Sequence, residues 1–127
     1  MFRILMADDS PTVRDMLRAM LAPESYDVLS AADGENAVRI ASAEKPDLVL
    51  LATILPRLNG YQVCRRLKAQ AATAHIPVIL LTSQRREAEQ ARRAEQGVDG
   101  YLTRPFSPEQ LQEVIRRYSP QSIQPQQ

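Results

Sequence analysis

The stretch PDLVLLATILPRLNG, residues 46–60, carries the pattern that decides the fold of this chain. Its apolar run, Leu48–Leu51, lies between a proline and a turn-forming segment over residues 56–60. A short apolar run without alternation is typical of a parallel strand that is buried on both faces. The stretch therefore predicts a central strand over residues 47–52, with Ala52 at the end where the strand leaves the sheet.

Similar short runs alternate with amphipathic stretches along the rest of the chain. Parallel neighbours need crossover connections, and these connections place helices on both faces of the sheet. We therefore predict a doubly wound α/β domain with five parallel strands and five helices. The other strands are expected over residues 2–7, 26–32, 77–82 and 101–103, with a turn at Asp33 and Gly34. The helices are expected after Ser10, around residues 37–41 and 63–67, over 85–96, and after Ser107.

The length of 127 residues suits one domain, which we place at residues 1–118. Residues 119–127 are rich in proline and glutamine, so we expect a disordered tail or the start of a linker. The 16 basic and 15 acidic residues balance to +1, which gives no electrostatic footprint for nucleic acid or an anionic membrane. Cys64 is the only cysteine, and no apolar run reaches the ~20 residues of a membrane span. We expect a cytoplasmic protein.

Several kinds of catalytic site find no support in the sequence. The four glycines form no phosphate-cradling loop, and no serine stands in a G-x-S-x-G elbow. His75 is the only histidine, and a lone histidine cannot build a metal site or a catalytic triad. A nucleotide or flavin carrier is also disfavoured, because Asp8 and Asp9 would repel a phosphate at the end of the first strand.

Asp8 and Asp9 are the most chemically suggestive pair in the chain. They follow the first strand and precede a helix that Ser10 would cap. Two adjacent carboxylates repel one another, and a hard cation such as Mg²⁺ relieves that repulsion. The alternative is structural: Asp9 helps to cap the helix and Asp8 is solvated. The local pattern leaves both readings open.

Over nearly its whole length the chain resembles the receiver domain of bacterial two-component response regulators. The resemblance rests on four segments in a specific order and spacing. The fold that it implies is a flavodoxin-like doubly wound sheet with strand order 2-1-3-4-5. The four segments are ILMADDS (4–10), PDLVLLATILPRLNG (46–60), PVILLTS (77–83) and GYLTRPF (100–106).

The resemblance implies a role for several residues of this chain. In the family, the acidic pair, here Asp8 and Asp9, binds Mg²⁺. An aspartate that ends the third strand accepts a phosphoryl group from a histidine kinase. A hydroxyl residue, here Thr82, hydrogen-bonds that group, and an aromatic residue, here Tyr101, swings inward in response. A lysine before the proline that matches Pro105 pairs with the phosphate.

Two positions depart from this pattern. The phosphoacceptor position holds Ala52, and the lysine position holds Arg104. A methyl group supplies no nucleophilic oxygen, and strand alternation should point the neighbouring Thr53 away from the site. We expect Arg104 to form an ion pair with Asp8 or Asp9 in the space that a metal would fill. The site should then hold no cofactor, or only weakly bound Mg²⁺.

These residues predict a pseudo-receiver, a signalling domain that works by phosphorylation-independent protein contact and is not an enzyme. The alternative is an ordinary phosphoacceptor receiver whose aspartate has been replaced by Ala52. In the family, partners such as a histidine kinase or another regulator bind the surface made by the fourth helix, fifth strand and fifth helix. Here that surface would include Arg86, Gln90, Arg93, Tyr101, Glu109 and Gln112.

Overall fold

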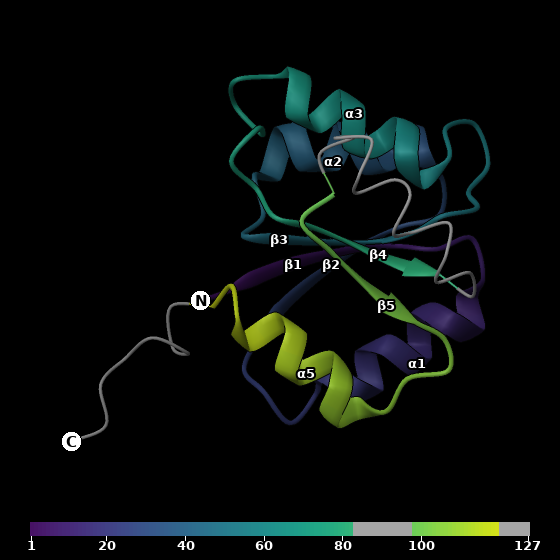
Figure 1. The fold of residues 1–127 in the computed structure, drawn as a ribbon, viewed down its shortest axis with the longest axis vertical. Helices are drawn as coiled ribbons and strands as arrows, with labels where there is room; N and C mark the ends of the chain where they lie inside the picture. The colour runs from purple at the N-terminus through teal and green to yellow at the C-terminus, as the bar shows by residue number, and fades with distance from the viewer. Residues whose placement is uncertain (83–97, 120–127) are drawn as a thin grey trace.

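The computed structural model describes residues 1–82 and 98–119 (Figure 1). The helix expected over residues 85–96 lies outside the described residues, and so do Arg86, Gln90 and Arg93 of the expected partner surface. Residues 120–127 of the expected tail also lie outside them, and for these residues the tail stays a prediction. Ser119, which the sequence places in that tail, is buried, and its backbone N–H donates to the carbonyl of Arg116.

Strands and helices alternate along residues 1–82, as the sequence predicts. Five parallel strands form one sheet in the order β2-β1-β3-β4-β5. The predicted fold class and strand order are therefore confirmed. The bounds are β1 Arg3–Ala7, α1 Pro11–Leu21, β2 Asp27–Ala31, α2 Gly34–Glu44, β3 Leu48–Ala52, α3 Gly60–Ala69, β4 Val78–Thr82, β5 Gly100–Thr103 and α5 Pro108–Arg116.

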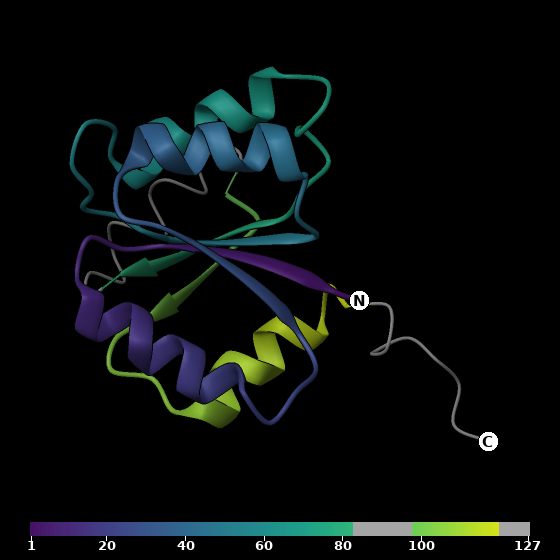
Figure 2. The same ribbon diagram turned by 180° about the vertical axis from the view of Figure 1, so that it is seen from behind.

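The sheet is sandwiched between two pairs of helices, with α2 and α3 on one face and α1 and α5 on the other (Figures 1 and 2). Every residue of β3 is buried. Val49 and Leu51 join the core under α2 and α3, whereas Leu48 and Leu50 join the core under α1 and α5. The apolar run lacks alternation because both of its faces are covered.

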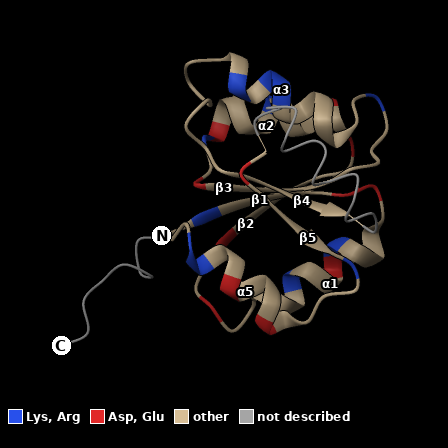
Figure 3. Cartoon of the chain, in the orientation of Figure 1, with Lys and Arg blue, Asp and Glu red and all other residues tan. Residues whose placement is uncertain are grey.

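Charged residues lie mainly on the helices and loops that surround the sheet (Figure 3). Within the described part of the chain, no helix has both the length and the apolar character that crossing a bilayer requires.

The helix starts follow from side chains that cap the first backbone N–H groups. Ser10 and Ser107 precede prolines and accept hydrogen bonds from the backbone at the starts of α1 and α5. The sequence predicts a turn at Asp33 and Gly34, but Asp33 is the N-cap of α2 and accepts from the Asn36 N–H at 2.8 Å. This hydrogen bond lowers the pKa of the Asp33 carboxyl below its ordinary value of 3.8.

Cys64 should be protected from thiol reagents in the folded protein. It is fully buried on α3, and burial raises the pKa of its thiol to about 11. At pH 9 the unfolded chain should therefore react rapidly with a maleimide, because its thiol has an ordinary pKa near 9.0. The folded chain should react at least ~100-fold more slowly. Equal labelling rates with and without denaturant would contradict this placement.

Candidate functional site

A cleft of about 270 Å³ opens where the carboxyl ends of β1 and β3 lie side by side. The pairing of Ala7 with Leu51 brings the residues that follow the two strands together. The carboxyl edge of a doubly wound sheet is where ligands usually bind. The cleft is lined by Asp8, Asp9, Ser10, Val13, Ala52, Thr53, Ile54, Leu81 and Arg104.

Asp8 is the buried centre of this cleft, only 4% exposed. Its Oδ1 accepts from the Ser10 N–H at 2.9 Å, and its Oδ2 accepts from Arg104 Nη2 at 2.8 Å. Its backbone carbonyl accepts from Arg14 Nη1 at 2.6 Å. Both carboxylate oxygens and the carbonyl are therefore engaged within the protein. Asp9, by contrast, is exposed.

Arg104 reaches the cleft from the connection between β5 and α5. Its backbone N–H donates to the carbonyl of Thr82 at 2.7 Å, which continues the pairing of β4 with β5. Its side chain then crosses to Asp8 and is 30% exposed. Of the two ion pairs that the sequence allows, the structure contains the one with Asp8. The Nε of Arg104 is buried and has no hydrogen-bond partner among the described residues.

Ala52 is 5% exposed, and the loop that follows it is held by close backbone contacts. A Cβ on Gly60 would lie 2.3 Å from the Ala52 carbonyl oxygen, and the Gly60 N–H donates to the Thr53 carbonyl at 2.9 Å. Thr53 borders the cleft, although alternation predicts that it points away. β3 ends at Ala52, so the strand period does not extend to Thr53, and the direction of the Thr53 side chain stays a prediction.

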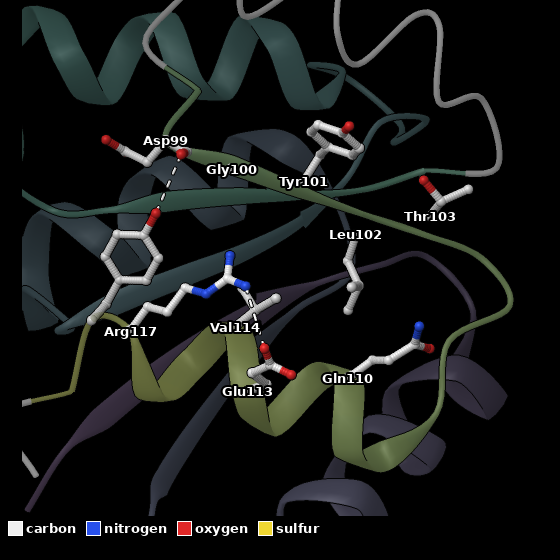
Figure 4. A pocket seen from close by; sticks show the side chains of 10 residues that line it. Asp99, Gly100, Tyr101, Leu102, Thr103, Gln110, Glu113, Val114 and Arg117 are labelled. Carbon is white, nitrogen blue, oxygen red and sulfur yellow. Dashed lines mark hydrogen bonds and ion pairs between the residues drawn. The ribbon is translucent and has the colours of Figure 1, made fainter. Parts of the chain in front are cut away.

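Thr82 and Tyr101 lie on β4 and β5, and neither is among the residues that line the cleft. Thr82 ends β4 and is 2% exposed. Tyr101 is half-buried and packs against the core under α2 and α3, on the side of β5 opposite to α5 (Figure 4). The neighbouring Leu102 belongs to the core under α1 and α5, as strand alternation requires.

The oxygen donors of the cleft are few. In residues 1–82 and 98–119, no group of three or more histidine, cysteine, aspartate or glutamate side chains is placed to hold a metal ion. The Asp8 carboxylate is already hydrogen-bonded through both oxygens. Position 52 contributes a methyl group, so Asp9 is the one carboxylate of the acidic pair whose oxygens face solvent.

Arg14, which donates to the Asp8 carbonyl, is not among the residues that the sequence predicts for the site. Arg14 lies one turn after the cap residue Ser10, and its backbone N–H donates to the Ser10 carbonyl. A side chain at that position of α1 can reach back to the end of β1. The position of Arg14 four residues after the cap residue Ser10 could have predicted this contact. The prediction would have been weak, because many arginines on helix surfaces lie at the same distance from a cap.

A second hollow, of about 640 Å³, lies between β5 and α5 (Figure 4). Tyr118 Oη donates to the Asp99 carbonyl at 3.2 Å, and Arg117 forms an ion pair with Glu113 at 3.4 Å. We call this hollow the β5–α5 groove. Its lining residues are Asp99, Gly100, Tyr101, Leu102, Thr103, Gln110, Glu113, Val114, Arg117 and Tyr118.

On α5, the two residues of the expected partner surface, Glu109 and Gln112, differ in their surroundings. Glu109 is exposed, as expected. Gln112 donates through Nε2 to the Met20 carbonyl at 2.9 Å, so it joins α5 to α1 and faces away from the β5–α5 groove. Gln112 follows the fully buried Leu111 by one residue, which places it at the flank of the buried stripe that α1 covers. Glu113 and Arg117 occupy the groove side instead.

Comparisons with known proteins agree on one family. The model of the response regulator receiver domain matches residues 4–116. The protein PilH of Pseudomonas aeruginosa is 43% identical over 115 residues, which are 91% of this chain and 95% of PilH. Other curated relatives are longer, and this chain spans between 46% and 55% of their lengths.

Solved structures agree with the sequence comparison. The receiver domain of a P. aeruginosa sensor histidine kinase, solved with a magnesium ion coordinated in its active-site cleft, is 32% identical with a TM-score of 0.84. The aligned part covers 92% of this chain and 96% of that one. The chemotaxis protein CheY4 of Vibrio cholerae is 29% identical with a TM-score of 0.86, over 94% and 99% of the two chains. The chain therefore belongs to the family of response regulator receiver domains of two-component signalling.

Proposed function

We propose that this receiver domain acts as a pseudo-receiver, a module that binds a protein partner without being phosphorylated. The observation that supports the proposal most strongly is the methyl group of Ala52 at the carboxyl end of the central strand. Capture of a phosphoryl group needs a nucleophilic oxygen in line with the phosphorus, and a methyl group has none.

The other groups at the cleft are poor substitutes for the missing carboxylate. The Ser10 hydroxyl accepts from the Val13 N–H at 3.2 Å and so serves as the cap of α1. The Asp8 carboxylate is bound to Arg104 and to the backbone of Ser10. Thr53 carries a neutral hydroxyl, and the cleft holds no histidine that could act as its base.

The β5–α5 groove is the surface that we assign to the partner. It carries an aromatic ring, two aliphatic side chains and an ion pair within one concave face (Figure 4). Protein interfaces are enriched in aromatic residues and arginine at their centres, and Tyr118 and Arg117 fit that composition. The partner class that suits a receiver domain is a histidine kinase or another regulator.

A second candidate function rests on the residues that do match the family pattern. Asp8, Asp9, Thr82 and Tyr101 have the residue types that the family pattern calls for at these positions of the sequence. The chain would then be an ordinary receiver in which alanine replaces the phosphorylated aspartate. In that case, restoring one carboxylate should restore the switch.

The two functions are separated by NMR with beryllofluoride, a phosphoryl mimic, in the presence of Mg²⁺. The chain as given should show no selective amide shifts, because position 52 lacks the carboxylate that binds the mimic. Ala52→Asp should also stay silent if the Asp8–Arg104 pair has closed the site. Shifts of Thr82 and Tyr101 in Ala52→Asp would favour the ordinary receiver. Acetyl phosphate should leave the mass of the chain as given unchanged, and a covalent phosphoryl group would overturn the proposal.

A further inference from the structure

We propose that Arg104 is a built-in cation that replaces the divalent metal of this fold and holds the β5–α5 corner without any ligand. The inference deepens the proposed pseudo-receiver function and rests on it. It starts from a mismatch between the residues of the cleft and the needs of Mg²⁺. Magnesium requires near-octahedral oxygen coordination and usually keeps several waters around one or two open carboxylates.

Both carboxylate oxygens of Asp8 already accept hydrogen bonds, so neither is open to a metal ion. A metal ion on Oδ2 would have to displace Arg104 Nη2 from a contact of 2.8 Å, and one on Oδ1 would compete with the Ser10 N–H at 2.9 Å. A charge-assisted hydrogen bond of this length to a buried carboxylate is a strong one. The pair is also shielded, since the Asp8 side chain is only 6% exposed.

The charged residues around Asp8 balance one another. Asp8 and Asp9 supply two negative charges, and Arg104 and Arg14 supply two positive charges within contact of Asp8. A third carboxylate is missing because position 52 is alanine. Among the described residues these charges cancel and leave no net negative charge to attract a divalent cation, and a cation close to Asp8 would meet two guanidinium groups.

Arg104 connects the ends of β1 and β4 through its side chain and its backbone. Its side chain is bound to the residue that follows β1, and its backbone N–H is bound to the last residue of β4. Thr103, immediately before it, lines the β5–α5 groove. The ion pair thus ties the groove to the cleft from within the chain. A groove held in this way needs neither a metal nor a phosphoryl group to keep its shape.

Mn²⁺ is a suitable probe because it takes the same oxygen ligands as Mg²⁺ and broadens the NMR signals of nearby amides. The full chain is titrated with millimolar Mn²⁺, alongside Arg104→Gln and the control Arg117→Gln. The control removes an arginine that pairs with a carboxylate outside the cleft. Arg104→Gln frees Oδ2 of Asp8 and removes one positive charge. It should bind Mn²⁺ at least about tenfold more tightly than the chain as given, with broadening selective for Asp9, Ser10 and Thr53.

The chain as given and Arg117→Gln should show no broadening selective for these amides. Selective broadening in the chain as given would overturn the inference, and so would equal affinities of the chain and Arg104→Gln. If Arg104→Gln does not fold, Arg104→Met takes its place, because methionine also removes the charge and the donor while its unbranched side chain fills much of the same space, and tighter Mn²⁺ binding is again expected. The phosphorylation assay has an independent readout: a chain that binds Mn²⁺ but keeps its mass with acetyl phosphate would refute this inference alone.

Discussion

Gly34→Ala is expected to lower the free energy of unfolding by about 3 kcal/mol. The added Cβ would lie 2.0 Å from the carbonyl oxygen of Leu58 and 2.7 Å from its carbonyl carbon. Both atoms belong to the backbone of the loop between β3 and α3, so neither can move aside by changing a rotamer. The Gly34 N–H also donates to the Pro56 carbonyl of the same loop at 3.0 Å, and a shift of the loop would lengthen that bond.

Gly100→Ala is the matched control for this prediction. A Cβ there would meet the Cδ1 of Ile79 at 3.0 Å, and that atom is the tip of a flexible side chain. We expect a change within about 0.5 kcal/mol, because a strand position also favours alanine slightly over glycine. Urea denaturation followed by circular dichroism measures both variants. Equal losses at the two glycines would show that the approach of α2 to the loop is looser than the structure has it.

The fold was predictable because its strongest signals are local. The unbroken apolar run of β3 can be recognised in the sequence, because a strand that is covered on both faces needs no polar residue. Ser10 and Ser107 mark helix starts because a cap and a following proline leave few other structures open. Asp33 was assigned to a turn because aspartate before glycine serves turns and helix caps alike, and only the contact with the β3–α3 loop decides between them.

The candidate site was predictable only where the family pattern or the charge count constrained it. The ion pair of Arg104 with Asp8 or Asp9 was predictable from the family pattern, which brings these positions to one site, and from their opposite charges. Three contacts depend on the directions of side chains from different elements. They are the pairing of Arg104 with Asp8 and not Asp9, the hydrogen bond of Arg14 to the Asp8 carbonyl, and that of Gln112 to the Met20 carbonyl of α1. Periodicity cannot supply those directions, because it gives the buried face of one helix and not which neighbour covers its flank.

Loss of one partner of the Asp8–Arg104 pair should lower the stability of the fold more than loss of one partner of an ordinary surface ion pair. Exposed pairs contribute little because water screens them, whereas loss of one partner of a buried pair leaves an uncompensated charge. Asp8 is 4% exposed, and its neighbour Asp9 adds a second negative charge. Arg104 is 30% exposed, so part of the penalty is relieved by water that can reach the space it leaves.

Arg104→Ala is therefore expected to destabilise the fold by about 2 kcal/mol, below the loss for a fully buried pair. The same substitution in the Asp8→Asn background should cost less than about 1 kcal/mol, because asparagine carries no charge and still accepts the Ser10 N–H. Denaturant unfolding of the four proteins in this double-mutant cycle gives the coupling free energy directly. Equal costs of Arg104→Ala in both backgrounds would mean that Arg104 acts through packing alone. A coupling of about 1 kcal/mol or more is what a carboxylate that depends on this guanidinium requires.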